Sequence, residues 1–235
     1  MNILALDAST KNFSLAVSQN GRVRCFRNIR LTKVLDESII PAVEEILKKS
    51  KLTLGQVDGF AVGLGPGSFT SLRVGLSTVK ALSMATGKPI VGISSLDALA
   101  MNVIDQPCDE ICTIVDAKRN LLYAAFFKKQ KGRLKRTGGY VLTNVADLLE
   151  RAHGRTLFVG DGITLYRSQI EQAYDESAQK RKTNCRALFA DEHDGVPQAR
   201  KLAALASGRF EKKEYDDVDK LVPIYLYPAN CQVRK

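Results

Sequence analysis

The same succession of predicted strands and turns occurs twice in this chain. Asp7 and Asp116 each end a short apolar run, and Gly21 and Gly132 each lie in the second turn that follows, at offsets of 109 and 111 residues. In both copies a meander of three short strands leads into alternating helices and strands. A repeat of this length is a whole lobe rather than a solenoid unit, so the sequence predicts a duplicated α/β fold with two lobes.

The expected elements also give each lobe its bounds. The N-terminal lobe, residues 1–105, has expected strands at 3–6, 13–17, 23–29, 59–64 and 89–93 and helices at 33–50 and 69–86. The C-terminal lobe, residues 106–235, has expected strands at 111–116 and 121–127, a third strand ending at Leu142, a helix at 145–153 and a strand at 156–162. The polar stretch 175–194 is expected to be irregular, and a final helix at 197–207 is expected to return to the N-terminal lobe. Two lobes of this kind indicate the actin-like ATPase (ASKHA, ribonuclease H-like) architecture.

The segment GLGPGSFTSLRVGLSTVKAL, from Gly63 to Leu82, lies where nucleotide-binding proteins place a phosphate loop. Its glycines match neither G-x-G-x-x-G nor G-x-x-x-x-G-K-[ST]. Pro66 removes a backbone N–H from the loop, and no lysine lies within the loop. Ser68 is a suitable N-cap and Gly87 a suitable C′ residue. The segment therefore predicts a helix from Phe69 to Thr86, and not a phosphate site.

Charge is unevenly distributed along the chain. Its 35 Lys and Arg against 25 Asp and Glu leave a net charge of +10, which favours a polyanion or an acidic partner. One basic segment spans 128–136 and another spans 180–186. A solvated hairpin tip is the favoured interpretation of the first, because no aromatic residue interleaves its charges. RNA contact is the alternative.

Cysteine usage and hydropathy indicate a cytoplasmic protein. The five cysteines are scattered without a C-x-x-C, which fits a reducing compartment, and we favour plain thiols over a metal site at Cys108 and Cys112. No apolar run approaches eighteen residues, and the start of the chain lacks the pattern of a signal peptide. We therefore expect no membrane association.

Several segments resemble the TsaB (YeaZ) family of bacterial tRNA threonylcarbamoyladenosine synthesis. They are ILALDAST near the N-terminus, SIIPAVEEIL, GPGSFTSLRVGLSTVKAL, VDAKRNLLYAAFF and, near the C-terminus, VPIYLY. The glycine-proline-glycine segment is the most specific of them. Two positions depart from the family pattern, since Ser71 replaces a usual glycine and Tyr227 stands where arginine is usual.

The resemblance implies that the chain is not itself the transferase. It implies pairing with the related subunit TsaD, which carries the metal and the active site, and with the ATPase TsaE. The complex forms N6-threonylcarbamoyladenosine at position 37 of tRNAs that read codons starting with adenine. Ser95 and Leu99 stand where the catalytic relative has two metal-binding histidines, so we expect no metal, cofactor or catalytic residue here. A surface built for a related subunit can also pair with itself, which leaves a homodimer open.

The turns that would approach a nucleotide contain no glycine. They are 7–10 and 116–119, whereas actin-like ATPases bring two glycine-bearing turns to the phosphates. Asp7 and Asp116 could hold magnesium, but turn residues that bind their own backbone are the favoured interpretation. The motif GDG at 160–162 is likewise expected to be a turn. The alternative function is an ATP-using enzyme, such as a small-molecule kinase of this superfamily.

Small side chains recur at spacings of three and four along the helix 69–86. Because a glycine in a helix interior costs about 1 kcal/mol against alanine, Gly75 indicates the close approach of another backbone. We expect the helices 33–50 and 69–86 to form the partner surface, with the contacts made by Ile39, Val43, Ser71, Gly75 and Thr78. Leu72, Leu76 and Val79 are expected to face the lobe's own sheet. Under the alternative, the small residues pack only against the first helix of the same lobe.

Overall fold

The structure is a computed structural model, and it describes residues 1–30, 35–130, 132–152, 154–181 and 185–227. It divides into two compact units, which we treat separately. The N-terminal unit contains residues 1–98 and 197–224, and the C-terminal unit contains residues 99–196 and the end of the chain from Tyr225. The division therefore falls at Ala98, earlier than the predicted residue 105, and the last helix lies in the N-terminal unit.

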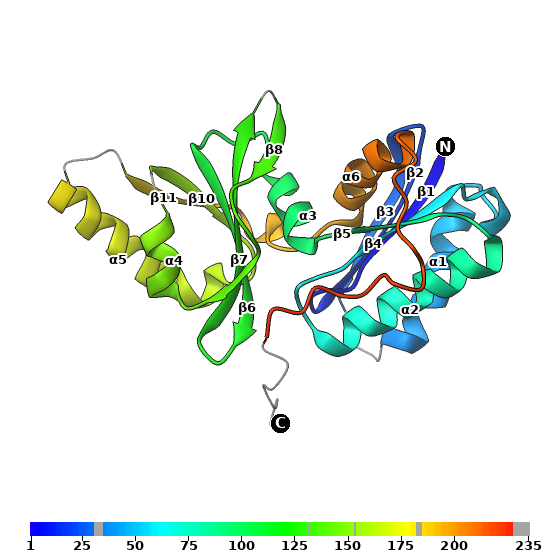
Figure 1. Cartoon of the computed structure of the whole chain (residues 1–235), viewed down its shortest axis with the longest axis horizontal. Helices are drawn as coiled ribbons and strands as arrows, with labels where there is room; N and C mark the ends of the chain where they lie inside the picture. Colours follow the sequence, from blue (N-terminus) through cyan, green and yellow to red (C-terminus); the bar gives the residue numbers. More distant parts are fainter. Residues whose placement is uncertain (31–34, 131, 153, 182–184, 228–235) are drawn as a thin grey trace. The chain divides into compact units, whose positions relative to one another are not determined.

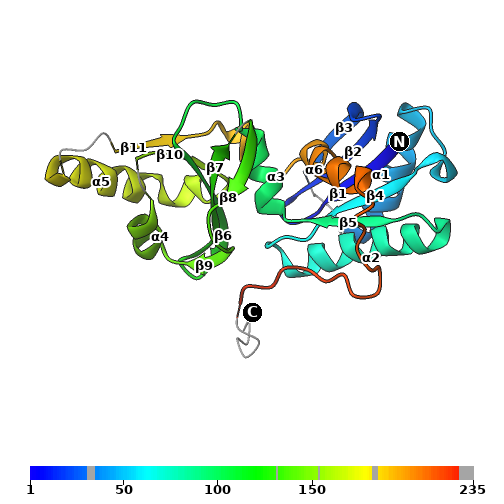
Figure 2. The same ribbon diagram turned by 45° about the horizontal axis from the view of Figure 1, so that its top comes forward.

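The sheet of the N-terminal unit has the order β3-β2-β1-β4-β5 (Figure 1). Its strands are β1 (Asn2–Asp7), β2 (Asn12–Gln19), β3 (Arg22–Arg30), β4 (Gly59–Gly63) and β5 (Ile90–Ile93). The first three form the predicted antiparallel meander, β4 pairs in parallel with β1, and β5 pairs in parallel with β4. Helices α1 (Leu35–Lys49) and α2 (Phe69–Thr86) cover one face, and α6 (Ala199–Glu211) covers the other (Figure 2). A short 3-10 helix, η1 (Leu54–Gln56), follows α1.

The sheet of the C-terminal unit repeats this order as β8-β7-β6-β10-β11. Its strands are β6 (Glu110–Lys118), β7 (Leu121–Gln130), β8 (Arg133–Arg136), β10 (Arg155–Val159) and β11 (Arg186–Phe189), and β9 (Val141–Thr143) also pairs with β7. Helices α4 (Val145–Arg151) and α5 (Ile163–Arg181) lie on one face, and η2 (Glu192–Asp194) is a 3-10 turn. The matching strand orders confirm the duplicated, two-lobe actin-like fold.

Strand β1 is buried on both faces because helices cover both. Leu4 and Leu6 contribute to the core under α1 and α2, whereas Ile3 and Ala5 contribute to the core under α6. Along α6, Phe210 fills the space above Gly59, where an added Cβ would lie 2.4 Å from the Phe210 ring. The alternation of a strand therefore distributes β1 between two apolar layers.

Three helices depart from the sequence prediction. Helix α3 (Ser95–Asn102) was not predicted, and α6 continues through Gly208 to Glu211 because Phe210 is buried in the core. Helix α5 and strand β11 occupy much of the stretch that was predicted to be irregular. The helix extends into this stretch because Tyr166, Ile170 and Tyr174, spaced by four, anchor it to the core.

An extended segment after α6 covers the edge of the N-terminal unit's sheet. Asp216 pairs with Ile90 of β5, accepts a hydrogen bond from the Gly92 N–H (2.7 Å) and forms an ion pair with Arg209 (3.0 Å). Further on, the Ile224 N–H donates to the Leu64 carbonyl (2.8 Å). The edge of β5 is therefore not left free for pairing with another chain.

Among the described residues, every helix is too short or too polar to span a bilayer.

Candidate functional site

The Asp7 carboxylate lies at the end of β1, where the resemblance to nucleotide-binding folds would place a functional acid. It is fully buried and accepts three hydrogen bonds from two serines. The Ser9 N–H (2.9 Å) and the Ser9 hydroxyl (2.6 Å) donate to Oδ1, and the Ser95 hydroxyl donates to Oδ2 (2.6 Å). Asp7 is thus the turn residue that the sequence predicted, with an additional bond to the start of α3.

The glycines of the GLGPG segment make room for this network. An added Cβ would lie 2.0 Å from Asp7 Oδ2 at Gly63 and 2.1 Å from the Ser9 carbonyl oxygen at Gly67. The Gly65 N–H donates to the Ser95 hydroxyl oxygen (3.1 Å). The loop therefore contacts its own lobe through positions where only glycine fits, a role that the sequence did not reveal.

Burial raises the pKa of Asp7 above its ordinary value, and the hydrogen bonds from Ser9 and Ser95 oppose this shift. No cation accompanies the carboxylate in these contacts. Ser95 is engaged with Asp7, and Leu99 is buried. Among the described residues no three His, Cys, Asp or Glu side chains form a group that could hold a metal ion. Of the two cysteines considered for a metal, Cys112 is buried within β6, which raises the pKa of its thiol well above the ordinary value.

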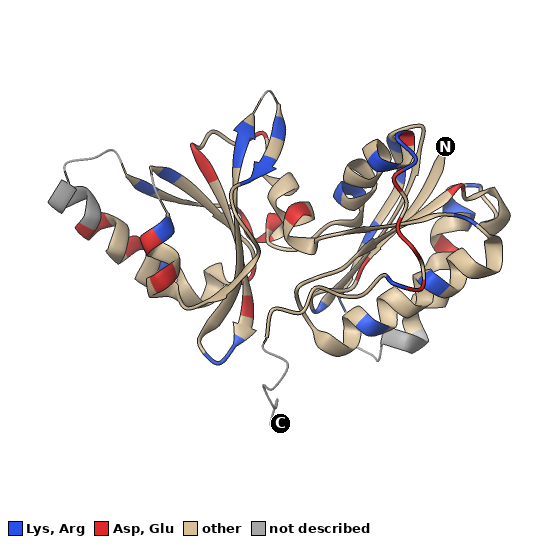
Figure 3. Cartoon of the chain, viewed as in Figure 1, with Lys and Arg blue, Asp and Glu red and all other residues tan. Residues whose placement is uncertain are grey.

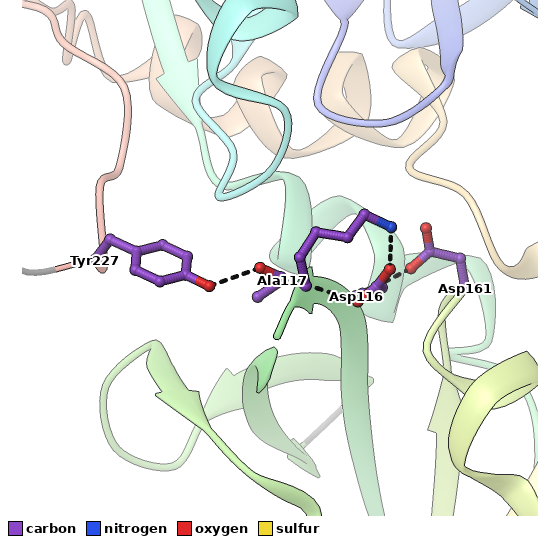
Figure 4. A network of polar contacts seen from close by, with 5 residues as sticks. Asp116, Ala117, Asp161 and Tyr227 are labelled. Carbon is purple, nitrogen blue, oxygen red and sulfur yellow. Dashed lines mark hydrogen bonds and ion pairs between the residues drawn. The ribbon is translucent and has the colours of Figure 1, made fainter. Parts of the chain in front are cut away.

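The equivalent aspartate of the C-terminal unit is also bonded to its own turn. Asp116 Oδ1 accepts from the Lys118 N–H (2.8 Å), and its carboxylate forms an ion pair with the Lys118 ammonium. The Asp116 N–H in turn donates to Asp161 (3.0 Å), which belongs to the GDG motif (Figure 4). Gly160 lies against the Ile114 carbonyl, where an added Cβ would be 2.0 Å from the oxygen. Asp116 thus bonds the backbone of its own turn, and the GDG motif at 160–162 is a turn, as predicted.

Tyr227 anchors the end of the described chain to the same turn (Figure 4). Its hydroxyl donates to the Ala117 carbonyl (2.7 Å), and its ring meets the edge of Tyr123 at a centroid distance of 6.1 Å. Tyrosine at this position therefore has a packing role within the C-terminal unit.

Three of the five residues that the sequence named for the partner surface are buried in the lobe itself. Ile39 and Val43 are 2% and 3% exposed and belong to the lobe's own core, as do Leu76 and Val79. Gly75 is also buried, and an added Cβ would lie 3.0 Å from Ala8 Cβ and 3.1 Å from Leu6 Cδ2. Gly75 thus admits β1 of its own lobe and does not face outward. A larger residue there would disturb the lobe itself.

The other two predicted positions remain partly exposed. The Ser71 hydroxyl bonds the Ser68 hydroxyl (3.0 Å), and the Thr78 hydroxyl donates to the Val74 carbonyl one turn earlier (2.9 Å). Both hydroxyls are therefore satisfied within α2 or at its start. Such residues can lie in an interface without requiring a polar group from a partner.

Apolar side chains that the sequence analysis did not name are exposed on α1 and α2. Ile40 is 42% exposed, Phe69 54% and Met84 65%. Beside Ile40 lies a hollow of about 430 Å³ that is lined by Ile40, Val43, Glu44, Leu47, Lys48, Leu52, Thr53, Leu54 and Leu82. Aliphatic walls with a few charged side chains are typical of a protein-binding surface.

Comparison with known proteins gives one family and several named relatives. A family model described as TsaD, tRNA N6-adenosine threonylcarbamoyltransferase, matches residues 32–230. The tRNA threonylcarbamoyladenosine biosynthesis protein TsaB of Bacillus subtilis is 27% identical over 100% of this chain and 97% of its own length. TsaB of Haemophilus influenzae is 34% identical, with the match spanning 57% of this chain and 56% of that protein. The chain thus spans about half the length of some relatives and nearly all of another.

Solved structures share the fold. YeaZ from Pseudomonas aeruginosa superposes with a TM-score of 0.79 at 24% identity, over 96% of this chain and 99% of that one. A ROK hexokinase from Thermus thermophilus superposes with a TM-score of 0.51 at 13% identity, over 88% of this chain and 100% of that one. At these identities the comparison shows a common architecture and nothing about chemistry.

The buried Asp7 predicts a specific pH dependence of stability. Its folded pKa is raised above the ordinary 3.8, so between these two values the folded protein holds a proton that the unfolded chain has released. The free energy of unfolding of the wild type should therefore fall as pH rises through this window. In Asp7→Asn this contribution to the pH dependence should be absent. Urea unfolding of both proteins from about pH 4 to about pH 7 measures the difference. A wild-type minus variant difference that is independent of pH would contradict the assignment.

Proposed function

The chain belongs to the TsaB (YeaZ) family, and we propose that it is the non-catalytic partner of a TsaD-type transferase. Its relatives are named for tRNA threonylcarbamoyladenosine biosynthesis, and the proposed role lies in that process in the cytoplasm. The product is N6-threonylcarbamoyladenosine at position 37 of tRNAs that read codons starting with adenine. TsaE and the tRNA complete the proposed complex.

The observation that carries the proposal is the exposed apolar surface of α1 and α2. Ile40 on α1 and Phe69 and Met84 on α2 expose large apolar side chains, and Ile40 also lines a hollow with aliphatic walls. Covering such side chains contributes about 25 cal/mol per Å² of apolar area removed from water. Glu44 and Lys48, which also line the hollow, supply charged groups of the kind found around the centre of many interfaces. We propose that the related subunit contributes a helix pair of its own to this surface.

Contacts within each unit support a non-catalytic role. The Asp7 carboxylate accepts hydrogen bonds from Ser9 and Ser95, and the Asp116 carboxylate forms an ion pair with Lys118. A carboxylate that holds a magnesium ion must turn an oxygen toward the metal. An ATP-using enzyme remains the alternative, but the likeness to the hexokinase concerns the fold alone.

The same surface can also accept a second copy of the chain. An isologous contact through α1 and α2 would bury the same apolar residues. We propose that the homodimer, where it forms, competes with the transferase subunit for this surface.

Reconstitution tests the function directly. The purified chain should show neither ATP hydrolysis nor threonylcarbamoyl transfer, because no acid at either turn is free. Added to the transferase subunit, TsaE, tRNA and threonylcarbamoyl-adenylate, it should raise the yield of modified tRNA well above the yield without it. Turnover by the chain alone, after removal of contaminating enzymes, would contradict the proposal.

Ile40→Asp should separate partner binding from folding. The charged side chain would lie at the centre of the proposed contact, and burying it unpaired costs several kcal/mol, so complex formation should fall by a factor of 100 or more, on the order of 3 kcal/mol. The melting temperature should change little, since Ile40 is already exposed in the free chain. Co-purification and calorimetry with the transferase subunit measure the effect.

Val23→Asp is the matched control. Val23 lies on β3, outside the helix pair, and its exposed fraction of 46% is close to that of Ile40. This variant should bind the transferase subunit as the wild type does. Equal loss in both variants, or full binding by Ile40→Asp, would exclude the helix pair as the interface.

A further inference from the structure

We propose that one end of the C-terminal unit's sheet binds the phosphate backbone of folded RNA. The surface, here called the basic rim, consists of Lys128, Lys129, Arg133 and Lys135 on the β7–β8 hairpin and Arg186 at the start of β11. All five side chains are exposed. This inference rests on the proposed function, because a tRNA substrate supplies the RNA.

The hairpin extends beyond the rest of the sheet. Strand β6 pairs with β7 only as far as Ile111 opposite Phe127, whereas β7 and β8 continue to pair as far as Gln130 opposite Arg133. The result is a two-stranded ribbon, and no other strand of the described residues pairs with it there. Six of the nine residues from 128 to 136 are Lys or Arg and none is acidic, although Lys131 lies outside the described residues. Side-chain alternation places Lys128, Arg133 and Lys135 on one face of the ribbon.

The described carboxylates do not neutralise the cations of the hairpin's rim residues. Within the part of the chain that the structure describes, no carboxylate forms an ion pair with Lys128, Lys129, Arg133 or Lys135. Lys128 lies directly opposite Lys135, and like charges in this position destabilise a strand pair. Arg136 differs, since its Nε donates to the Gly138 carbonyl (2.9 Å) and its guanidinium lies 3.9 Å from the centroid of the Tyr140 ring.

The strand order brings the second basic segment to the same end of the sheet. Strands β6, β10 and β11 are parallel and begin at the end where β7 finishes, and Figure 3 shows Lys and Arg at the hairpin and at the starts of β10 and β11. Arg155 at the start of β10 is exposed and paired with Asp109 (3.1 Å), and the exposed Arg186 lies opposite Arg155 on β11. Four strand spacings separate β8 from β11, so the rim is about 19 Å wide. A surface of this width can contact several phosphates of one backbone.

The composition of the rim favours an RNA backbone over other polyanions. A protein interface needs an apolar centre and a membrane surface needs apolar side chains to insert, yet none of the large exposed apolar residues lies on the hairpin. Stacking on bases needs a free aromatic face, and the Tyr140 ring is covered by Arg136. Point charges on a projecting ribbon suit contacts to phosphates of a structured RNA, which carry no sequence information.

The test measures binding of the purified chain to an unmodified transcript of a tRNA that reads codons starting with adenine. The rim variant Lys128→Glu/Arg133→Glu/Lys135→Glu should weaken binding about tenfold or more and reduce the slope of log Kd against log salt concentration by about 2 to 3. The control Lys11→Glu/Arg24→Glu/Lys212→Glu carries the same charge change at exposed residues of the N-terminal unit. It should bind within about twofold of the wild type.

Three outcomes of the tRNA-binding measurements alone would overturn the proposal. They are the absence of salt-dependent tRNA binding by the wild type, an unchanged rim variant, and equal losses in the rim and control variants. Competition adds two further arms, with phosphatidylserine vesicles and with polyglutamate. Displacement of rim-dependent binding by tRNA but not by either competitor at equal charge supports the RNA assignment, and stronger binding to either competitor overturns it.

The single variant Lys135→Glu gives a readout that a structural role cannot mimic. It replaces a like-charge pair with an opposite-charge pair against Lys128, so the melting temperature should stay equal or rise while tRNA affinity falls. A variant that loses stability and affinity together would show that the hairpin's role is structural.

The rim variant also separates this inference from the proposed function. It should still form a complex with the transferase subunit, because α1 and α2 are unchanged. If the rim variant forms the complex and its tRNA affinity is unaltered, the RNA-binding role of the rim is refuted and the proposed function is not. A rim that binds tRNA in a chain that binds no transferase subunit refutes the proposed function alone.

Discussion

The hydrogen bonds around the Asp7 carboxylate connect the parts on which the N-terminal unit depends. They join the end of β1, the glycine-proline-glycine loop and the start of α3. Removing a carboxylate from water costs several kcal/mol unless its oxygens are bonded, and the Ser9 and Ser95 donors offset part of that cost. The glycines follow from this constraint, because side chains at Gly63 and Gly67 would overlap Asp7 and Ser9.

This junction also determines where α2 begins and hence which surface the helix presents. The Ser68 N–H donates to the Ser9 carbonyl (2.8 Å), so the first turn of α2 is fixed against the end of β1. Gly75 then admits Leu6 and Ala8 close to the helix axis. With its inner side pressed on β1, α2 exposes Phe69 and Met84, and α1 beside it exposes Ile40. The Asp7 junction therefore determines which side of α2 is exposed, and this is the surface that we propose for the partner.

Sequence reasoning was most successful where local signals are strong. The bounds of α2 from Phe69 to Thr86 agree with the prediction, because Gly87 takes the left-handed conformation expected of a C′ residue. The repeated meander and both aspartate turns were likewise predictable from short-range patterns. Helices α3 and α5 could not be predicted in this way. Their apolar side chains are buried only when strands distant in sequence pack against them. The Asp7–Ser95 contact joins residues 88 positions apart and leaves no local signal.

The assignment of Ile39 and Val43 to the partner surface was wrong for a simple reason. Ile39, Val43, Ile46 and Leu47 recur at helical spacing, and such a stripe faces the core of the helix's own lobe. Ile40 lies about 100° around the helix from Ile39 and so falls outside the buried stripe. The same pattern could therefore have assigned Ile39 to the core and Ile40 to the surface. The orientation of Gly75 toward β1 required the packed structure.

Hydrogen exchange on the chain with and without the transferase subunit tests the central claim most directly. If the chain is a partner that acts through its helix pair, backbone amides in 38–49 and 69–86 should gain protection on mixing, and β11 at an edge of the C-terminal unit's sheet should not change. Protection confined to the C-terminal unit, or no change anywhere at concentrations where the complex forms, would contradict the account.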